Sequence, residues 1–154
     1  LVGEPTTFFK NAAMQWGTDC EPAARAAYEL KHDTEVVECA FIEHNEMPNY
    51  IGVSPDGLVG VDGLLEIKCP NTVTHLKYFM AGTMPAEYLA QVQGQLWVSG
   101  RDWCDFVSYD PRVRTEADYF ELRVSRDEEY IKNLEVQCGT FIEELKELLT
   151  KLGA

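Results

Sequence analysis

The chain contains no apolar run that approaches the roughly 20 residues a helix needs to cross a bilayer. Its first ten residues, Leu1 to Lys10, lack the basic start and long apolar centre of a signal peptide. No internal repeat or low-complexity segment interrupts its 154 residues, and the composition is that of an ordinary folded protein. These absences argue against a membrane-spanning, fibrous or mainly disordered chain and predict one domain over residues 1–154.

Paired cysteines are also missing. The five cysteines are scattered: Cys20, Cys39, Cys69, Cys104 and Cys138. They form no CxxC pair, and no histidine lies at the spacing of a zinc site. An iron–sulfur cluster would need four converging cysteines, and the spacing gives no sign of them. The pattern predicts reduced thiols in a cytoplasmic protein.

Basic residues are scarce, with 13 Lys and Arg against 26 Asp and Glu and a formal net charge of −13. Because phosphate neutralisation dominates the affinity for nucleic acid, this balance alone favours a protein that does not bind it. A basic groove can nevertheless coexist with acidic outer faces, and acidic clusters suit hard divalent cations. The net charge therefore leaves both interpretations open.

Helical and extended patterns alternate along the chain. Helices are predicted over residues 4–16 (interrupted at Gly17), 21–30 (N-capped by Asp19), 74–80 (capped by Thr72 or Thr74), 85–98 and 126–152. Strands are predicted over residues 36–42, 50–53, 58–61, 64–68, 103–109 and 119–124, with Asp62-Gly63 as a hairpin turn. The last helix is expected to bury one face: Ile131, Leu134, Phe141, Ile142, Leu145 and Leu149. The order predicts an α/β fold with a central mixed β-sheet flanked by helices.

Three charged residues stand out in the middle of this pattern. Asp56 lies in a tight-turn sequence, Glu66 follows in a strand, and Lys68 comes two residues later. The period of two in a strand places Glu66 and Lys68 on one face and directs Ile67 to the other, toward the core. Because unpaired buried charges are costly, a Glu and a Lys in an apolar strand must be paired, metal-bound or catalytic.

The oxygen donors of this trio suit a metal. The carboxylates of Asp56 and Glu66 and the carbonyl of Ile67 are hard ligands of the kind that Mg²⁺ or Mn²⁺ prefers. Lys68 beside them could orient a water molecule or stabilise developing phosphate charge. The set fits metal-assisted phosphodiester hydrolysis. A plain salt bridge between Glu66 and Lys68 on an exposed hairpin stays open as the alternative.

Four motifs in order surround the trio: Ser54-Pro55-Asp56-Gly57, Leu65-Glu66-Ile67-Lys68-Cys69-Pro70, Tyr88-Leu89-Ala90-Gln91-Val92-Gln93 and Tyr109-Asp110-Pro111-Arg112. Together they resemble the phage lambda exonuclease (alkaline exonuclease, YqaJ-type viral recombinase) family within the PD-(D/E)xK nuclease superfamily. The similarity extends upstream to Trp16-Gly17 with Glu21 and downstream through the last helix, so it covers nearly the whole chain. It implies a restriction-endonuclease-like core.

The resemblance assigns metal binding to Asp56, Glu66 and the Ile67 carbonyl, and positioning or activation of the water to Lys68. It implies that Glu21 assists a second metal through water, although a carboxylate favoured by the helix dipole is the alternative.

The resemblance also places Tyr88 and Gln91 at the border of the site, with core packing as the alternative for each. Ser54 would contact the DNA backbone or only form its turn. The three histidines match no motif and are expected at the surface: His32, His44 and His75.

Members of that family digest one strand of duplex DNA processively from a 5′ end, form a ring-shaped homotrimer around the DNA, and work with a single-strand annealing protein in phage recombination. The resemblance therefore implies a Mg²⁺-dependent (or Mn²⁺-dependent) 5′→3′ exonuclease in the cytoplasm of a bacterial host. Candidates for a basic DNA lining are Lys77, Arg101, Arg112, Arg114 and Arg123.

Two alternatives stay open: an endonuclease or nickase of the same fold without end selection, and a non-catalytic DNA- or protein-binding module. The family usually has a longer N-terminal region with an Arg-containing segment that holds the 5′ phosphate. We expect part of that region to be lacking here, which would affect the recognition of DNA ends and leave the metal site intact.

Overall fold

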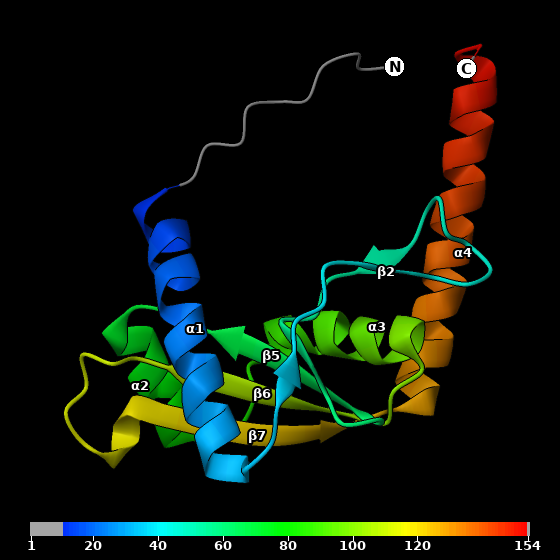
Figure 1. Cartoon of the computed structure of the whole chain (residues 1–154). Coiled ribbons are helices and arrows are strands. Elements are labelled where there is room, and N and C mark those ends of the chain that lie inside the picture. The colour runs from blue at the N-terminus through cyan, green and yellow to red at the C-terminus, as the bar shows by residue number, and fades with distance from the viewer. Residues whose placement is uncertain (1–10, 154) are drawn as a thin grey trace.

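A mixed β-sheet crosses the middle of the protein in the computed structural model, which describes residues 11–153 (Figure 1). The strand order is β1-β4-β5-β6-β7. These strands are β1 (Val36–Val37), β4 (Gly57–Val59), β5 (Gly63–Lys68), β6 (Trp103–Tyr109) and β7 (Tyr119–Ser125). Only β5 and β6 pair in parallel, and the other neighbours are antiparallel. The predicted α/β fold with a mixed sheet is confirmed.

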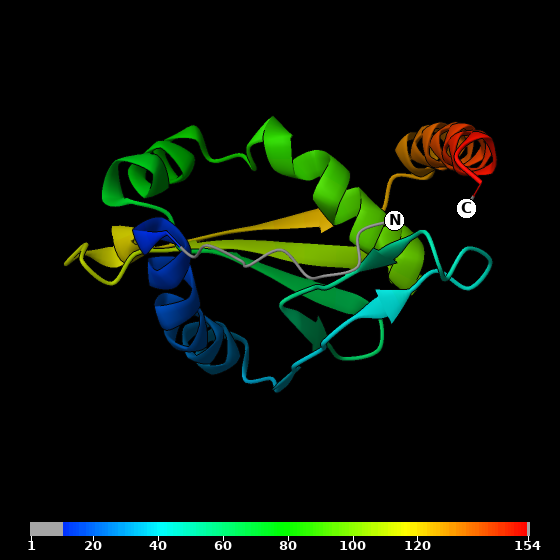
Figure 2. The ribbon, with the colours of Figure 1, turned by 90° about the horizontal axis from the view of Figure 1, so that it is seen from above.

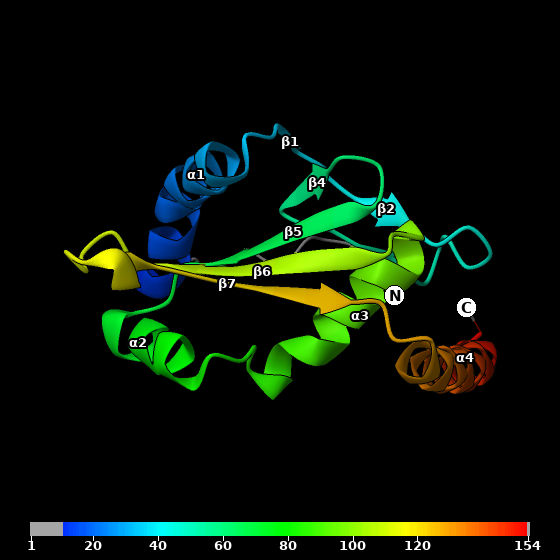
Figure 3. The ribbon, with the colours of Figure 1, turned by 90° about the horizontal axis from the view of Figure 1, so that it is seen from below.

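Helices cover both faces of this sheet, as the views along it show (Figures 2 and 3). Helix α1 (Ala12–His32) lies on one face, and α2 (Thr72–Ala81) and α3 (Leu89–Ser99) lie on the other. Helix α4 (Glu128–Lys151) packs beside α3, and a two-stranded ribbon of β2 (Ile42–Glu43) and β3 (Gly52–Val53) lies against α3. Short 3₁₀ turns span Ala86–Tyr88 and Glu116–Asp118.

Strand β5 divides the core into two layers. Leu65 and Ile67 pack with residues of α1, and Leu64 packs with residues of α3. Each such fully buried side chain stabilises the fold by about 1.5–3 kcal/mol. The alternation predicted for this strand is therefore confirmed: Ile67 points into the core, and Glu66 lies on the opposite face, toward α3.

Helix α1 differs from the prediction. It runs unbroken through Gly17 and Pro22 and begins after Asn11, whose side chain accepts a hydrogen bond from the Met14 amide; Asp19 caps nothing. The predicted interruption at Gly17 was wrong because the helix buries a face made of Cys20, Ala24 and Tyr28 against the sheet. This packing outweighs the cost of a glycine inside a helix, which is about 1 kcal/mol. The predicted start at Glu4 lies outside the described residues.

The predicted strand over residues 36–42 is in fact two strands in different sheets. β1 pairs with β4, whereas β2 pairs with β3 in the separate ribbon. The turn between β4 and β5 spans residues 60–62 and begins at Gly60, whose φ of +53° suits glycine; Asp62 lies in this turn as predicted, but Gly63 does not. Gly63 instead opens β5, where a β-carbon would lie 2.2 Å from the Trp103 ring.

Three helix details also correct the prediction. Asn71 caps α2, not Thr72 or Thr74. The predicted helix over residues 85–98 begins as the 3₁₀ turn and then continues as α3, ending at Gly100 as expected. α4 begins after Asp127. Phe141 was expected on the buried face of this helix but is 64% exposed, because the adjacent Ile142 takes the buried position and directs Phe141 away from it.

All five cysteines lie within the described residues and are free thiols there. Between residues 11 and 153, none of the helices combines the length and apolarity that crossing a membrane requires.

Candidate active site

Asp56 lies in the loop that leads into β4, and its carboxylate contacts the neighbouring strand. Its Oδ2 accepts a hydrogen bond from the Ile67 backbone N–H at 2.7 Å. β4 pairs with β5 only as far as Leu65, so no strand formed by residues 11–153 covers Ile67 on this side. Because the N–H and C=O of a strand residue point to the same side, the Ile67 carbonyl also faces the space beside Asp56.

Glu66 is the best-connected side chain of the site. It is only 1% exposed. Its Oε1 accepts hydrogen bonds from the Lys68 ammonium and from Gln91 Nε2, the latter at 2.6 Å. Its Oε2 accepts one from Gln95 Nε2 at 2.7 Å. The predicted pairing of a buried Glu and Lys is present, and the carboxylate satisfies the requirement that a buried charge be hydrogen-bonded. The exposed salt bridge on a hairpin is excluded by this burial.

Lys68 lies at the mouth of the site, between Glu66 and an aromatic ring. Its Nζ is 5.0 Å from the centroid of the Tyr88 ring, which packs in turn against Phe106. Tyr88 therefore borders Lys68 and also packs against the buried Phe106, so a place at the border of the site and a place in the core are compatible for it. Burial disfavours the ammonium, but the Glu66 carboxylate outweighs it and keeps the pKa of Lys68 above its ordinary value. Lys68 is thus a cation and a hydrogen-bond donor.

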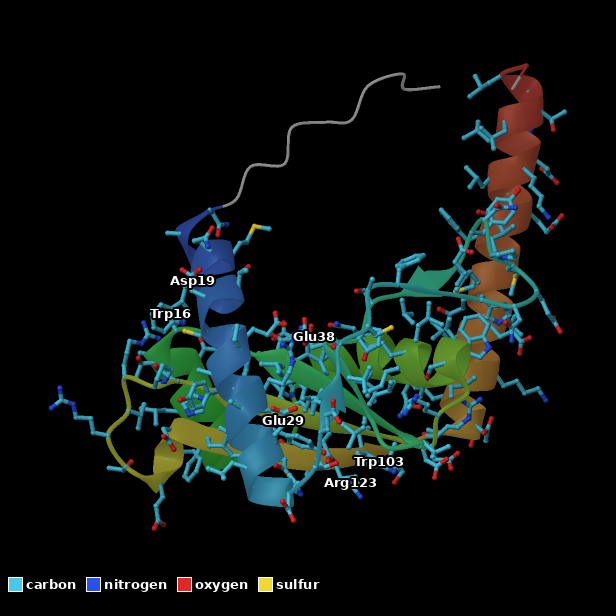
Figure 4. All side chains as sticks on the ribbon, in the orientation of Figure 1. Trp16, Asp19, Glu29, Glu38, Trp103 and Arg123 are labelled. Atoms are coloured by element: carbon cyan, nitrogen blue, oxygen red, sulfur yellow. The ribbon has the colours of Figure 1, made fainter. Side chains whose placement is uncertain are left out.

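A third acidic side chain, that of Glu21, approaches from α1, where Arg25 holds it. Arg25 Nη2 donates to Glu21 Oε1 at 2.7 Å and to the Asp56 backbone carbonyl at 3.2 Å, and its Nη1 lies 3.0 Å from Glu38 Oε1. Figure 4 shows Glu38 beyond the end of β1, on the segment that passes in front of the sheet. Arg25 therefore ties α1 to the loop that holds Asp56.

The site carries more negative charge than its own cations neutralise. Burial and then the Glu66 carboxylate raise the pKa of Asp56, and Glu21 adds to this effect, while the Ile67 amide and Lys68 oppose it. Two carboxylates, a free carbonyl and a nearby third carboxylate form a donor set of hard oxygens. Such a set fits Mg²⁺ or Mn²⁺ better than a soft metal.

The residues predicted to contact DNA lie in different surroundings. Ser54 is exposed, and its hydroxyl donates to the Ala40 carbonyl at 2.5 Å, which ties down the loop. Lys77 is exposed on α2. Arg112 is 45% exposed, donates twice to Asp110 and stacks on the Trp16 ring at 4.1 Å.

The other three candidates for a basic lining differ among themselves. Arg101 donates to backbone carbonyls of the β4–β5 hairpin, at 2.7 Å for Gly63. Arg123 binds Asp105 through two hydrogen bonds and stacks on the Trp103 ring at 3.6 Å, where Figure 4 shows the two side by side. Arg114 is exposed. Arg101 and Arg123 therefore both make hydrogen bonds within the protein that stabilise the fold.

The histidines do not all lie at the surface. His75 is fully buried, with one ring nitrogen 2.8 Å from the Ser108 hydroxyl and the other 2.7 Å from the Ala117 carbonyl. The surface prediction was wrong for it because α2 turns this position onto β6. His32 is exposed, as expected, and His44 is half-buried against Trp97.

Two residues of this constellation had no place in the prediction, Gln95 and Arg25. Gln95 lies four residues after Gln91, so helical spacing alone would place both on one face of α3. Arg25 lies four residues after Glu21 on α1 in the same way. Spacing from a predicted site residue was therefore a signal that could have found both.

Comparisons with known proteins identify similar chains that include the residues of this site. Residues 2–102 match the family model of the YqaJ-like viral recombinase domain. An uncharacterised Escherichia coli (strain K12) protein named ExoD is 31% identical over 80 residues, which cover 51% of this chain and 91% of that protein. An uncharacterised protein of Acanthamoeba polyphaga mimivirus is 29% identical over 118 residues, covering 68% of this chain and 21% of that protein.

Solved structures are similar too. An alkaline exonuclease (LHK-Exo) from Laribacter hongkongensis is 44% identical with a TM-score of 0.90, over 94% of this chain and 74% of that one. The structure of LHK-Exo in complex with dAMP matches with the same identity and TM-score. A phage-related exonuclease from Haemophilus somnus 129PT is 15% identical, with a TM-score of 0.74 over 96% of this chain and 77% of that one. The last similarity concerns the fold alone.

Proposed function

Since the chain belongs to the YqaJ-like viral recombinase family, we propose that it is a divalent-metal-dependent exonuclease that degrades one strand of linear duplex DNA in the 5′→3′ direction. At the coarser level, the family and the 44% identity to an alkaline exonuclease make it a nuclease. The observation that carries metal-dependent hydrolysis is the buried Glu66 carboxylate, held by Lys68 and lying beside Asp56, next to the Ile67 carbonyl. The action on DNA ends and the 5′→3′ direction are proposed from the family resemblance.

The carboxylates of Asp56 and Glu66 and the carbonyl of Ile67 would hold Mg²⁺ or Mn²⁺, and Glu21 would reach a second ion through water. When bound, an ion of this kind would supply Lewis-acid chemistry, making water a better nucleophile and withdrawing charge from the scissile phosphate. The three oxygen donors come from one strand and the loop next to it, so the fold brings them together before any ligand binds.

Lys68 acts in this proposal as a donor and not as a base, because Glu66 keeps it protonated. Its N–H groups orient the attacking water and stabilise the charge that develops on the phosphate. The Tyr88 ring limits where the ammonium can lie, and Gln91 holds Glu66 Oε1 from the α3 side. Tyr88 and Gln91 therefore complete the catalytic set.

Ser54, Lys77 and Arg112 are the residues that we propose for contacts to the DNA backbone. Several of the basic side chains described above are already bonded within the chain, as Arg25, Arg101 and Arg123 are. Because one copy then offers few free cations among residues 11–153, gathering copies around the duplex would concentrate them. This supports a homotrimer that encloses DNA. The family resemblance is the ground for proposing that it acts in the bacterial cytoplasm with a single-strand annealing protein.

The test compares linear duplex DNA with covalently closed circles in the presence of Mg²⁺. We expect degradation of the linear form only, with loss of a 5′ label before a 3′ label, and no reaction in EDTA. The Glu66→Ala variant serves as the inactive control. Cleavage of the circles would replace the exonuclease by an endonuclease or nickase, and binding without cleavage of either form would leave a non-catalytic binding module.

A further inference from the structure

Gln95 contacts the side of Glu66 that faces away from Lys68. It lies on α3 one turn after Gln91, is 2% exposed, and donates from Nε2 to Glu66 Oε2 at 2.7 Å. Gln91 donates to the other oxygen, Oε1, which also accepts from Lys68. Two amides from one helix face therefore hold the two oxygens of a single carboxylate.

The other end of the Gln95 amide is left unsatisfied. Its Oε1 is buried and has no hydrogen-bond partner among residues 11–153. A buried acceptor without a partner costs about 1–3 kcal/mol. Methionine or leucine at this position would fill similar space without that cost, so packing does not explain a glutamine here. The bond donated to Glu66 is the interaction that a glutamine provides and an apolar side chain does not.

We propose that Gln95 is a positioning residue, which fixes the plane of the Glu66 carboxylate so that Oε1 stays turned toward Lys68 and the metal ligands. The terminal torsion of a glutamate is broad, so a carboxylate held at one oxygen only can swing about it. Gln95 removes this freedom from the buried side, where no solvent competes. The inference rests on the proposed function, because Glu66 must be a metal ligand for its orientation to matter.

Gln93 provides a matched control on the same helix. It is likewise buried, 1% exposed, and makes two hydrogen bonds through its amide. Its Nε2 donates to the Ser125 carbonyl at 2.9 Å, and its Oε1 accepts from the Asp127 amide at 2.9 Å. These bonds join α3 to the end of β7 and the start of α4, away from Glu66. Gln93→Met therefore removes a buried amide and leaves the site untouched.

The experiment measures Mn²⁺ binding without DNA, by calorimetry and by the electron paramagnetic resonance signal of free Mn²⁺. The full chain is compared with its Gln95→Met and Gln93→Met variants, and their folding is checked by circular dichroism. We expect Gln95→Met to raise the Kd for Mn²⁺ by about 10–100-fold, the loss typical when the hydrogen-bond partner of a ligand is removed. Gln93→Met should leave that Kd unchanged. If Gln95→Met fails to fold, Gln95→Asn keeps an amide that is too short to reach Glu66.

Each outcome decides the inference. A loss of Mn²⁺ affinity in Gln95→Met but not in Gln93→Met supports it. Equal affinity in the wild type and Gln95→Met, or an equal loss in both variants, overturns it while the proposed function stands. If the wild type binds no Mn²⁺, the proposed function fails and this assignment fails with it.

Discussion

The Asp56 carboxylate accepts a hydrogen bond from the backbone N–H of Ile67 at 2.7 Å, at the point where β4 no longer pairs with β5. This side chain thus takes the place of a strand at the sheet edge. The same contact sets the carboxylate beside the free carbonyl of Ile67. Asp56 therefore combines a structural role, which needs only an acceptor oxygen, with a proposed metal-binding role, which needs its charge.

Asp56→Asn separates these two roles. The asparagine oxygen can still accept a hydrogen bond from the Ile67 N–H. The substitution removes the negative charge of Asp56, which the Glu66 and Glu21 carboxylates repel. We expect the thermal unfolding midpoint to be unchanged or higher. DNA hydrolysis should fall by more than about 100-fold, beyond the loss seen when only the partner of a metal ligand is removed. Asp62→Asn, at an exposed turn, is the control, and a fully active Asp56→Asn would remove Asp56 from the site.

Lys68→Ala should lower the rate of hydrolysis by about 100–1,000-fold, and Glu66→Ala, which removes a proposed metal ligand, should abolish it, each in a folded protein. Lys68 is 24% exposed at the side chain, and Gln91 reaches solvent, so water can satisfy these two groups, and Glu66→Ala leaves only the Gln95 amide without a partner on the buried side. Loss of one preorganised donor at a developing charge lowers kcat by about 100–1,000-fold. Single-turnover rates and circular dichroism measure both properties. Lys146→Ala, which breaks an exposed pair with Glu143, should change neither, and undiminished cleavage by Lys68→Ala would refute its role.

Arg25→Met should destabilise the protein and weaken its activity. The Arg25 side chain is 11% exposed and bridges Glu21 to the Asp56 loop, so the substitution leaves a carboxylate and a carbonyl without their donor. We expect the free energy of unfolding in urea to fall by about 2 kcal/mol, the scale of a hydrogen bond to a charged group. Lys31→Met on the same helix breaks an exposed pair and should cost less than about 1 kcal/mol. Equal losses in the two variants would contradict the bridging role.

Asp110 predicts a particular dependence of stability on pH. Burial alone would raise the pKa of this carboxyl, but hydrogen bonds from Arg112 and Thr72 outweigh burial and lower the pKa to about 2. Because the folded pKa is depressed, the stabilisation is present above about pH 4 and is lost as the pH falls toward 2. Unfolding in urea should show wild type and Asp110→Asn converging by about 2 kcal/mol between pH 6 and pH 2. A difference that does not change with pH would exclude this linkage.

The central strands and the shared face of Glu66 and Lys68 were predictable because several signals agreed on them. Glu66 and Lys68 are separated by an apolar residue in an apolar strand, so the period of two alone sets their common face. The end of α3 at Gly100 likewise follows from local chemistry, since its φ of +70° favours glycine. These features depend on neighbours in the sequence.

Features that depend on contacts distant in sequence were missed. Residues 36–42 look like one strand, but the chain leaves the sheet after Val37, where Glu38 pairs with Arg25 of α1. In the sequence, Gln93 and Gln95 look equivalent. Only the packing of α3 against the sheet directs Gln93 to Ser125 and Gln95 to Glu66. Gly17 suggested a helix end because local propensity does not include the face that α1 buries.

Anomalous diffraction from crystals soaked in Mn²⁺ tests the central claim most directly. The account predicts a peak bounded by the carboxylates of Asp56 and Glu66 and by the Ile67 carbonyl, and its disappearance in Asp56→Asn crystals. A Mn²⁺ peak elsewhere, with this position empty at saturating metal, would contradict the assignment of this site as the metal centre of the nuclease.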